Sequence, residues 1–208
     1  MKTSGRLYLM AAGLLLSSVG CTGPSRETKP PCCRQDAAAP VQATNSLTPG
    51  SLYQVESIWT NDAGKMLRLS DFRGRPRIIT MFFANCQSAC PLLVADMRRI
   101  EKALPENLRS KVGFILVTFD PERDTPEALQ KCRNDHHLGE NWTLLRGNPD
   151  DVLELAALLG VKYKKAGAGQ FFHSNLITIL DRNGEIAFQQ IGLDQDPRPA
   201  VTALQKLP

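Results

Sequence analysis

Apolar residues form two short continuous runs in the middle of the chain, Ile78–Phe83 (IITMFF) and Val112–Phe119 (VGFILVTF). Both runs are rich in β-branched and aromatic side chains, which predicts strands that are buried on both faces of a sheet. Between them, over Leu92–Leu104, apolar residues recur at helical spacing. The pattern therefore predicts a strand, a helix and a second strand in succession.

Turn residues and helix-capping residues divide the rest of the folded part into further elements. We expect one domain over residues 47–208, because about 160 residues suit a single core. The expected elements are strands over Tyr53–Trp59, Met66–Leu69 and Trp142–Leu145, helices over Pro126–Asn134, Asp150–Leu159 and Pro197–Lys206, and a hairpin of Leu176–Leu180 and Ile186–Gln190 around Asn183-Gly184. This order predicts an α/β domain with helices on both faces of the sheet.

Two cysteines, Cys86 and Cys90, follow the first buried strand and begin the helix that comes after it. Unpaired backbone N–H groups and the helix dipole favour thiolate there, and parallel α/β sheets place their sites at such junctions. If the helix has begun at Cys86, the two side chains share a face; if Cys86 lies in the loop, the chain can fold it back toward Cys90. Either way, the pair can chelate one metal ion or close a small disulfide, and two buried structural cysteines are the alternative. Cysteines at this junction make the domain thioredoxin-like, with the first two strands as an added N-terminal β-hairpin.

His173 is the most informative of the three histidines. It follows two phenylalanines and comes just before the apolar strand expected at Leu176–Leu180. From its neighbours alone, a residue of the core or its rim is the better interpretation. With two thiols elsewhere, however, it is the best candidate for a third ligand. His136 and His137 follow a polar helix end, and we expect them on the surface.

The first 20 residues have the features of a bacterial targeting segment. Lys2 and Arg6 supply positive charge, and Leu7–Leu16 is an apolar stretch too short to span a bilayer comfortably. Small residues then lead to Cys21, as in a lipoprotein signal that is cleaved before a lipid-bearing cysteine, although Ser18-Val19-Gly20 lacks the leucine usual at its start. An uncleaved anchor or an ordinary secretory signal is the alternative. All three place the rest of the chain outside the cytoplasm, where disulfides persist.

Residues 21–46 are expected to form a disordered membrane tether. They contain four prolines among Ser, Thr, Ala and charged residues, without apolar periodicity, so they cannot bury enough surface to fold. If largely extended, about 25 residues at about 3 Å each reach about 75 Å from the membrane. The adjacent Cys32-Cys33 can capture Cu(I), bridge to another chain or have no specific role.

The charge balance argues against a nucleic-acid partner. The chain has 25 Lys and Arg and 21 Asp and Glu, a net charge of +4. Without Lys2 and Arg6, 23 basic residues remain and the net charge is +2. A nearly neutral chain lacks the electrostatic footprint of a nucleic-acid-binding protein.

From about Leu52 to Ile191 the chain resembles the Sco/SenC family, the thioredoxin-fold copper proteins that serve respiratory oxidases. Three motifs carry the resemblance in order: Cys86-Gln87-Ser88-Ala89-Cys90-Pro91 matches the family's CxxxCP, residues 119–125 (FDPERDT) match its DPxRDT, and His173-Ser174 matches its late His-Ser. Residues 142–147 (WTLLRG) and 180–184 (LDRNG) also fit. The resemblance does not cover the targeting segment or the tether.

The resemblance implies a Cys2His copper site made of Cys86, Cys90 and His173. Two thiolates satisfy soft Cu(I), and an added imidazole supports Cu(II). Gln87 stands where the family usually has Pro, and Phe172 where it usually has Asp. Such departures leave the ligands unchanged and affect the groups that tune the redox potential and the partner surface.

The residues around the second strand's end have supporting roles at most. The family match makes Asp120 a residue that supports the ligands, and a helix-capping or turn carboxylate is the equal alternative. Arg123 and Asp124 are expected to fix their loop rather than to contact metal. Cys132, where the family often has an aromatic residue, is interpreted as a small buried hydrophobe.

Three functions follow from the resemblance and the thiols. The first is a copper-binding metallochaperone, not an enzyme, that assists assembly of the CuA site of cytochrome c oxidase or a related respiratory enzyme, with the apo subunit as its partner. The second is a thiol–disulfide reductase that keeps the acceptor's copper-ligand cysteines reduced and is itself served by a thioredoxin-like reductant. The third is a redox or copper sensor. In each, a lipid on Cys21 anchors the domain on the periplasmic side of a membrane in the bacterial cell envelope.

Overall fold

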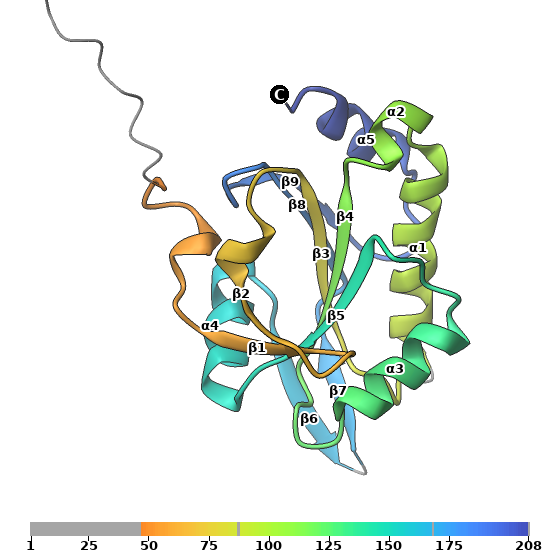
Figure 1. Ribbon diagram of the computed structural model, residues 1–208. Helices are drawn as coiled ribbons and strands as arrows, with labels where there is room; N and C mark the ends of the chain where they lie inside the picture. The colour runs from red at the N-terminus through yellow and green to blue at the C-terminus, as the bar shows by residue number, and fades with distance from the viewer. Residues whose placement is uncertain (1–46, 87, 168, 208) are drawn as a thin grey trace, which may run out of the picture. The chain divides into compact units, whose positions relative to one another are not determined.

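Seven strands form one mixed sheet in the order β2-β1-β5-β4-β3-β8-β9 in the computed structural model, which describes residues 47–86, 88–167 and 169–207 (Figure 1). The predicted targeting segment and tether, with Cys21, Cys32 and Cys33, lie outside the described residues. The centre of the sheet is parallel and consists of β3 (Arg77–Phe82), β4 (Gly113–Thr118) and β5 (Trp142–Arg146). β3 and β4 are buried along their whole length, which explains their continuous apolar sequences.

Antiparallel strands flank the parallel centre on both sides. β8 (Leu176–Leu180) pairs with β3, and β9 (Ile186–Ile191) pairs with β8. The expected Asn-Gly turn joins β8 to β9, and its glycine, Gly184, has a φ of 85°, a conformation that glycine adopts without strain. On the other side, β1 (Ile58–Asn61) pairs with β5 and with β2 (Met66–Arg68). β1 and β2 thus form an antiparallel pair at this edge of the sheet.

The strand expected at Tyr53–Trp59 is wrong for its first residues. Leu52–Gln54 form a short 3-10 helix, η1, and the strand begins only at Ile58. The hydroxyl of Ser51 accepts the N–H of Tyr53 and caps this turn, and serine favours such caps. Tyr53 is buried, so its apolar ring marks a core contact rather than a strand position.

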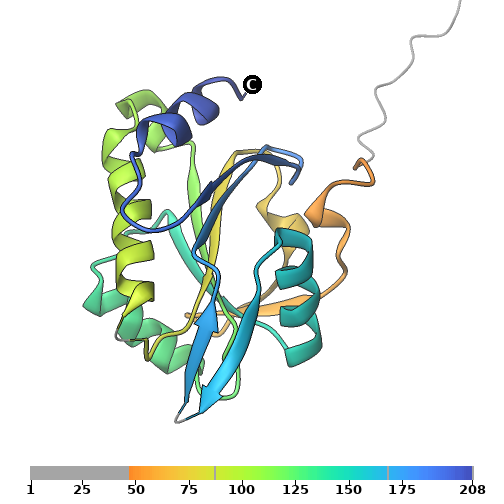
Figure 2. The same cartoon turned by 180° about the vertical axis from the view of Figure 1, so that it is seen from behind.

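Helices cover both faces of the sheet, as predicted. α1 (Ala89–Ala103) and α5 (Arg198–Gln205) lie against β8 on one face, where α3 (Pro126–Asp135) packs beside β5. α4 (Pro149–Leu159) lies on the opposite face in both views (Figures 1 and 2). Local signals set the helix ends: the hydroxyl of Thr125 accepts the N–H of Ala128 at the start of α3, and Gly160 has a φ of 75° after α4. The predicted α/β class is confirmed.

The sequence pattern does not predict four further short elements: η2 (Leu69–Phe72), α2 (Glu106–Arg109), and the strands β6 (Tyr163–Gly167) and β7 (Gln170–His173), which form a separate two-stranded sheet. The β6–β7 hairpin lies at the lower end of the domain in Figure 1, beyond the carboxyl ends of β3 and β4. β6 is largely exposed and consists mainly of Lys, Ala and Gly, so it shows no strand-like apolar alternation. This hairpin carries His173.

Candidate metal centre

Cys86 lies in the loop between β3 and α1, and Cys90 lies in the first turn of α1. Of the two placements considered for Cys86, the structure therefore has the loop. A turn folds this loop back, with the N–H of Cys86 donating to the carbonyl of Phe83 over 3.2 Å. The N–H of Cys90 then faces the Sγ of Cys86 at 3.4 Å. A backbone donor at the helix start, which has no partner within the helix, thus serves the first sulfur.

The two thiols differ in acidity. Burial raises the pKa of Cys86, but hydrogen bonds from the backbone of Cys90 and Ser88 outweigh it and hold the pKa below the ordinary value for a thiol. At Cys90 burial dominates and raises the pKa far above that value. Cys86 is therefore the more readily ionised thiol, and Cys90 stays protonated until a binding partner replaces its proton.

His173 completes a cluster with the two cysteines. Its Nε2 lies 3.7 Å from the Sγ of Cys90, and the ligand atoms of Cys86, Cys90 and His173 all lie within 4.8 Å of one another. The other ring nitrogen, Nδ1, is 3.1 Å from the carbonyl oxygen of Ser174. A carbonyl accepts only from a protonated nitrogen, so this contact assigns the proton to Nδ1 and leaves the lone pair of Nε2 directed at the sulfurs.

Aromatic side chains hold the β6–β7 hairpin against the ends of β3 and β4. The ring centroid of Phe171 lies 5.2 Å from that of Phe83 and 5.0 Å from that of Phe119, and Tyr163 stacks on Phe119 at 5.2 Å. The imidazole of His173 also lies over Phe119, at 5.1 Å. Each such pair contributes about 0.5–1.5 kcal/mol beyond area burial. We call Phe83, Phe119, Tyr163 and Phe171 the aromatic cluster, and it sets the position of His173.

The loop after β4 connects the hairpin to the rest of the site. Asp120 is buried and pairs with the guanidinium of Arg123, whose Nη2 also donates to the carbonyl of Gly169 at the hairpin turn. Asp124 is buried as well, and it accepts the N–H of Ala84 over 2.9 Å, in the loop that leads to the first cysteine. One loop is therefore bonded to both segments that carry the cluster.

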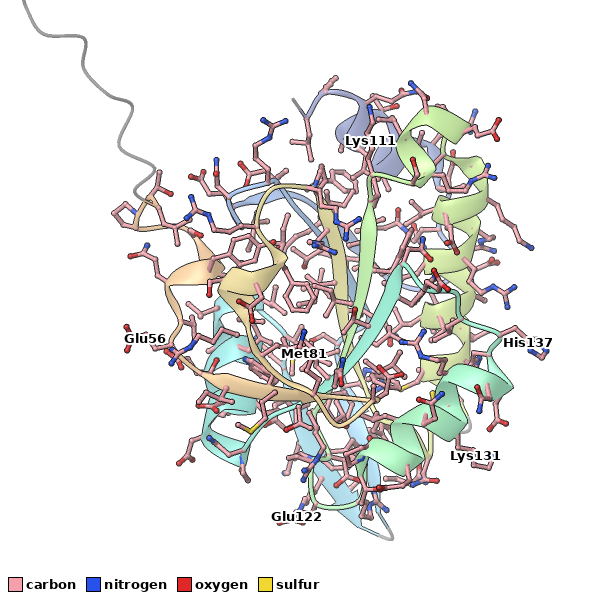
Figure 3. The ribbon with its side chains drawn as sticks, in the orientation of Figure 1. Glu56, Met81, Lys111, Glu122, Lys131 and His137 are labelled. Carbon is pink, nitrogen blue, oxygen red and sulfur yellow. The ribbon has the colours of Figure 1, made fainter. Side chains whose placement is uncertain are left out.

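The remaining candidate residues do not join the cluster. Asp120 is not one of its three members, and Arg123 links its carboxylate to the hairpin. Cys132 is buried in α3, as expected. His136 is partly buried, and His137 projects from the end of α3 into solvent (Figure 3). No helix within the described ranges is long and apolar enough to cross a membrane.

Sequence reasoning missed the residues that orient His173. The sequence pattern assigns no role to Tyr163 or Phe171, and Ser174 belongs to the His-Ser motif without a role of its own. A signal was present, because residues 167–169 (GAG) separate two short segments that each contain aromatic residues. Such an arrangement is typical of a hairpin with a glycine-containing turn.

This chain is similar to known proteins in both sequence and structure. A family model described as SCO1/SenC matches residues 52–207. The "SCO1 protein homolog" of Bacillus subtilis (strain 168) is 29% identical over 151 residues, which cover 70% of this chain and 77% of that protein. Among solved structures, a SCO1/SenC family lipoprotein from Bacillus anthracis is similar with a TM-score of 0.67 and 24% identity, over 78% of this chain and 99% of that chain. Bradyrhizobium japonicum ScoI with copper bound has a TM-score of 0.61 and 23% identity, over 72% and 96%.

Proposed function

This chain belongs to the SCO1/SenC family, and on that premise we propose that Cys86, Cys90 and His173 bind copper as cargo for delivery to the CuA site of cytochrome c oxidase or a related respiratory enzyme. One observation carries the proposal. Two sulfurs and an imidazole nitrogen from distant segments converge within 4.8 Å. The similar structure of B. japonicum ScoI has copper bound, which supports copper as the metal.

The donor set of the cluster fits copper. Thiolates are the soft ligands that Cu(I) prefers, and an imidazole suits Cu(II) as well. Zinc also accepts a Cys2His donor set, with water as its fourth ligand, so the three side chains that converge here do not by themselves select the metal. The copper-bound structure of the similar B. japonicum ScoI favours copper.

Each residue has a defined task in capture and release. Cys86 offers a sulfur that ionises readily, because backbone N–H groups stabilise its thiolate. Cys90 gives up its proton only when copper takes its place, so uptake releases that proton to solvent. His173 presents the lone pair of Nε2, since Nδ1 donates to Ser174. An acceptor with its own thiolates and imidazoles can then displace these three ligands one at a time.

The unequal acidity of the two thiols also favours a second candidate, a thiol–disulfide reductase. The Cys86 thiolate would attack a disulfide of the acceptor, form a mixed disulfide and expel one acceptor thiolate. Cys90 would then lose its proton, attack Cys86 Sγ and release the second acceptor thiolate. The acceptor gains two electrons, the protein is left with a Cys86–Cys90 disulfide, and a thioredoxin-like dithiol restores it. His173 has no task in this reaction.

The deciding experiment records visible absorption and electron paramagnetic resonance spectra of the reduced full chain with Cu(II). We expect an intense thiolate-to-copper charge-transfer band that His173→Ala perturbs and His137→Ala does not. Rapid oxidation to a disulfide without bound copper would favour the reductase. Transfer to an apo CuA domain then separates a chaperone from a sensor, which retains its metal.

The proposal for localisation rests on the first 21 residues alone. We propose that a lipid on Cys21 anchors the chain to a membrane of the bacterial cell envelope, with the domain on the periplasmic side. Cys21→Ser should move the protein into the soluble fraction of the cell envelope. A Cys21→Ser protein that stays with the membrane would indicate an uncleaved anchor.

A further inference from the structure

The two faces of the β6–β7 hairpin differ in their side chains. Tyr163 lies opposite His173 in the register, and both belong to the inner face with Phe171. Lys164 lies opposite Phe172 on the other face, where both side chains are exposed. The same hairpin therefore carries the third member of the metal cluster inside and a lysine–phenylalanine pair outside.

A shallow groove on the hairpin reaches His173, one of the three members of the metal cluster. It is open to solvent, has a volume of about 360 Å³ and is lined by Lys162, Tyr163, Lys164, Phe172, His173 and Ser174. His173 thus belongs to both the groove and the cluster. A molecule that exchanges copper with the cluster must come within bonding distance of these ligands, and a partner docked in the groove already lies against His173.

The hairpin concentrates positive charge on a nearly neutral protein. Residues 155–180 contain three lysines and neither Arg, Asp nor Glu. Lys165 pairs with Glu122 over 3.0 Å. Lys162 and Lys164 have no ion pair with any residue that the structure describes. Two unneutralised cations beside the groove favour a partner surface of opposite charge, and they also speed its approach.

Phe172 supplies an apolar contact surface among these lysines. Its side chain is 73% exposed, although the neighbouring Phe171 is buried. A single exposed apolar residue needs no explanation by itself. Here it lines the groove between lysines, and an aromatic anchor with a charged rim is the usual composition of a protein–protein contact.

We propose that the groove on the outer face of the hairpin docks an acidic segment of the copper-exchange partner, with an apolar residue of that segment against Phe172. This inference rests on the proposed copper function and adds the kind of surface that the partner presents. The chain's own tether does not fit, because residues 21–46 contain three basic and two acidic residues. A second copy docked through the same face does not fit either, because it would bring lysines against lysines.

The test uses the reduced, metal-free full chain and two synthetic peptides. In one peptide a central leucine is flanked by Asp and Glu; in the other, Asn and Gln replace every acid. Amide chemical shifts from nuclear magnetic resonance report both affinity and location. We expect saturable binding of the acidic peptide alone, with shifts concentrated in residues 162–174. Binding should weaken between about 20 and about 500 mM salt, where the Debye length falls from about 20 to about 4 Å.

Matched variants separate this surface from the rest of the protein. Lys162→Gln/Lys164→Gln should weaken binding about tenfold at low salt, roughly threefold for each exposed charge pair. The control Lys102→Gln/Lys111→Gln removes the same charge and should not change peptide binding. Figure 3 shows Lys111 at the opposite end of the domain from Glu122, the partner of Lys165. Phe172→Ser should weaken binding several-fold, whereas Ile191→Ser, at a side chain that is 78% exposed, should not.

Three results would overturn the proposal: no binding of the acidic peptide, equal binding of the neutral peptide, or equal losses in the control variants. Vesicles of phosphatidylglycerol and phosphatidylcholine provide one more arm. If they bind through the same lysines and Phe172 while the peptide does not, the surface contacts anionic lipid and not a protein. None of these binding measurements contains copper, so they are independent of the copper-transfer experiment. If the peptide binds but the protein fails to transfer copper, the copper function is refuted and the docking surface is not.

Discussion

The Sγ of Cys90 and the Nε2 of His173 lie 3.7 Å apart, although 83 residues separate them in the chain. Cys90 is fixed by the first turn of α1, whereas His173 is fixed by the aromatic cluster and by the carbonyl of Ser174. The cluster therefore joins two independently supported parts. Removing the histidine should leave the thiols in place, and this separation underlies the first prediction.

His173→Ala should preserve Cu(I) binding and weaken Cu(II) binding. Two thiolates suffice for Cu(I), whereas Cu(II) gains from the imidazole. We expect the loss for Cu(II) to be at least on the order of tenfold, because even residues that only support metal ligands contribute that much. Competition titrations of both oxidation states provide the measurement, with His137→Ala as control. Equal losses for Cu(I) and Cu(II) would contradict the three-ligand scheme.

Cys86→Ala and Cys90→Ala should each abolish tight copper binding, since a single thiolate cannot hold Cu(I) against competing thiols. The double variant Cys32→Ala/Cys33→Ala should retain one tightly bound copper per chain. Equilibrium dialysis with metal analysis measures both. If the tether variant lost all its copper, the metal would not belong to the domain.

Iodoacetamide at neutral pH should modify Cys86 well before Cys90 and Cys132. The thiolate is the reacting form, and the pKa of Cys86 lies below the ordinary value, whereas burial raises that of Cys132 to about 12. The rate at Cys86 should rise with pH and level off once the pH passes its lowered pKa. Mass spectrometry of proteolytic peptides assigns each site. Modification of Cys90 first would reverse the proposed order of the thiols.

Arg123→Gln should weaken Cu(II) binding more than Cu(I) binding, because Arg123 connects Asp120 to the hairpin that carries His173. Arg123→Lys should restore binding only in part, since an ammonium lacks the planar fork that bonds both acceptors. The Cu(II) resonance spectrum is the measurement, and a changed spectrum indicates altered ligand geometry. Arg198→Gln, in an exposed ion pair, is the control. Equal spectra for both variants would show that Arg123 does not position the hairpin.

Asp62→Asn should lower the free energy of unfolding by about 3 kcal/mol, the scale for breaking a largely buried ion pair. Asp62 pairs with Arg133, and the two side chains are 4% and 18% exposed. Lys131→Gln breaks a pair whose side chains are 75% and 56% exposed, so its cost should stay below about 1 kcal/mol. Urea unfolding measures both. Similar costs would show that burial does not strengthen the first pair.

Much of the fold follows from local sequence signals. The runs that form β3 and β4 are predicted because strands buried on both faces contain little except apolar residues. The ends of α3 and α4 are predicted from Thr125 and Gly160, since capping is a local interaction. The strand at Tyr53 is wrong because its aromatic ring packs into the core from a 3-10 turn, and tertiary contacts of this kind override strand propensity.

The residues of the site likewise divide into those that local sequence signals predict and those that depend on tertiary contacts. Cys86 and Cys90 can be located from their position between a strand and a helix. His173 is a candidate ligand from the sequence, but its neighbours alone favour a core residue, so the family resemblance is needed to select it. Asp62 follows β1 in residues 61–64 (NDAG), a sequence typical of a turn. Its buried pairing with Arg133 depends on the packing of α3 against β1. The sequence pattern therefore does not predict contacts between residues that are far apart in the chain.

Among the strands that the structure describes, β6 and β7 pair with each other and share no ladder with the seven-stranded sheet. A residue inserted into the turn of this hairpin, or removed from it, leaves the register of every strand in the large sheet unchanged. Turn length is therefore open to variation during evolution without loss of the fold. A lineage can shift the reach of His173 or the outline of the outer groove by changing this one turn, and a designer can graft an alternative hairpin at the same place.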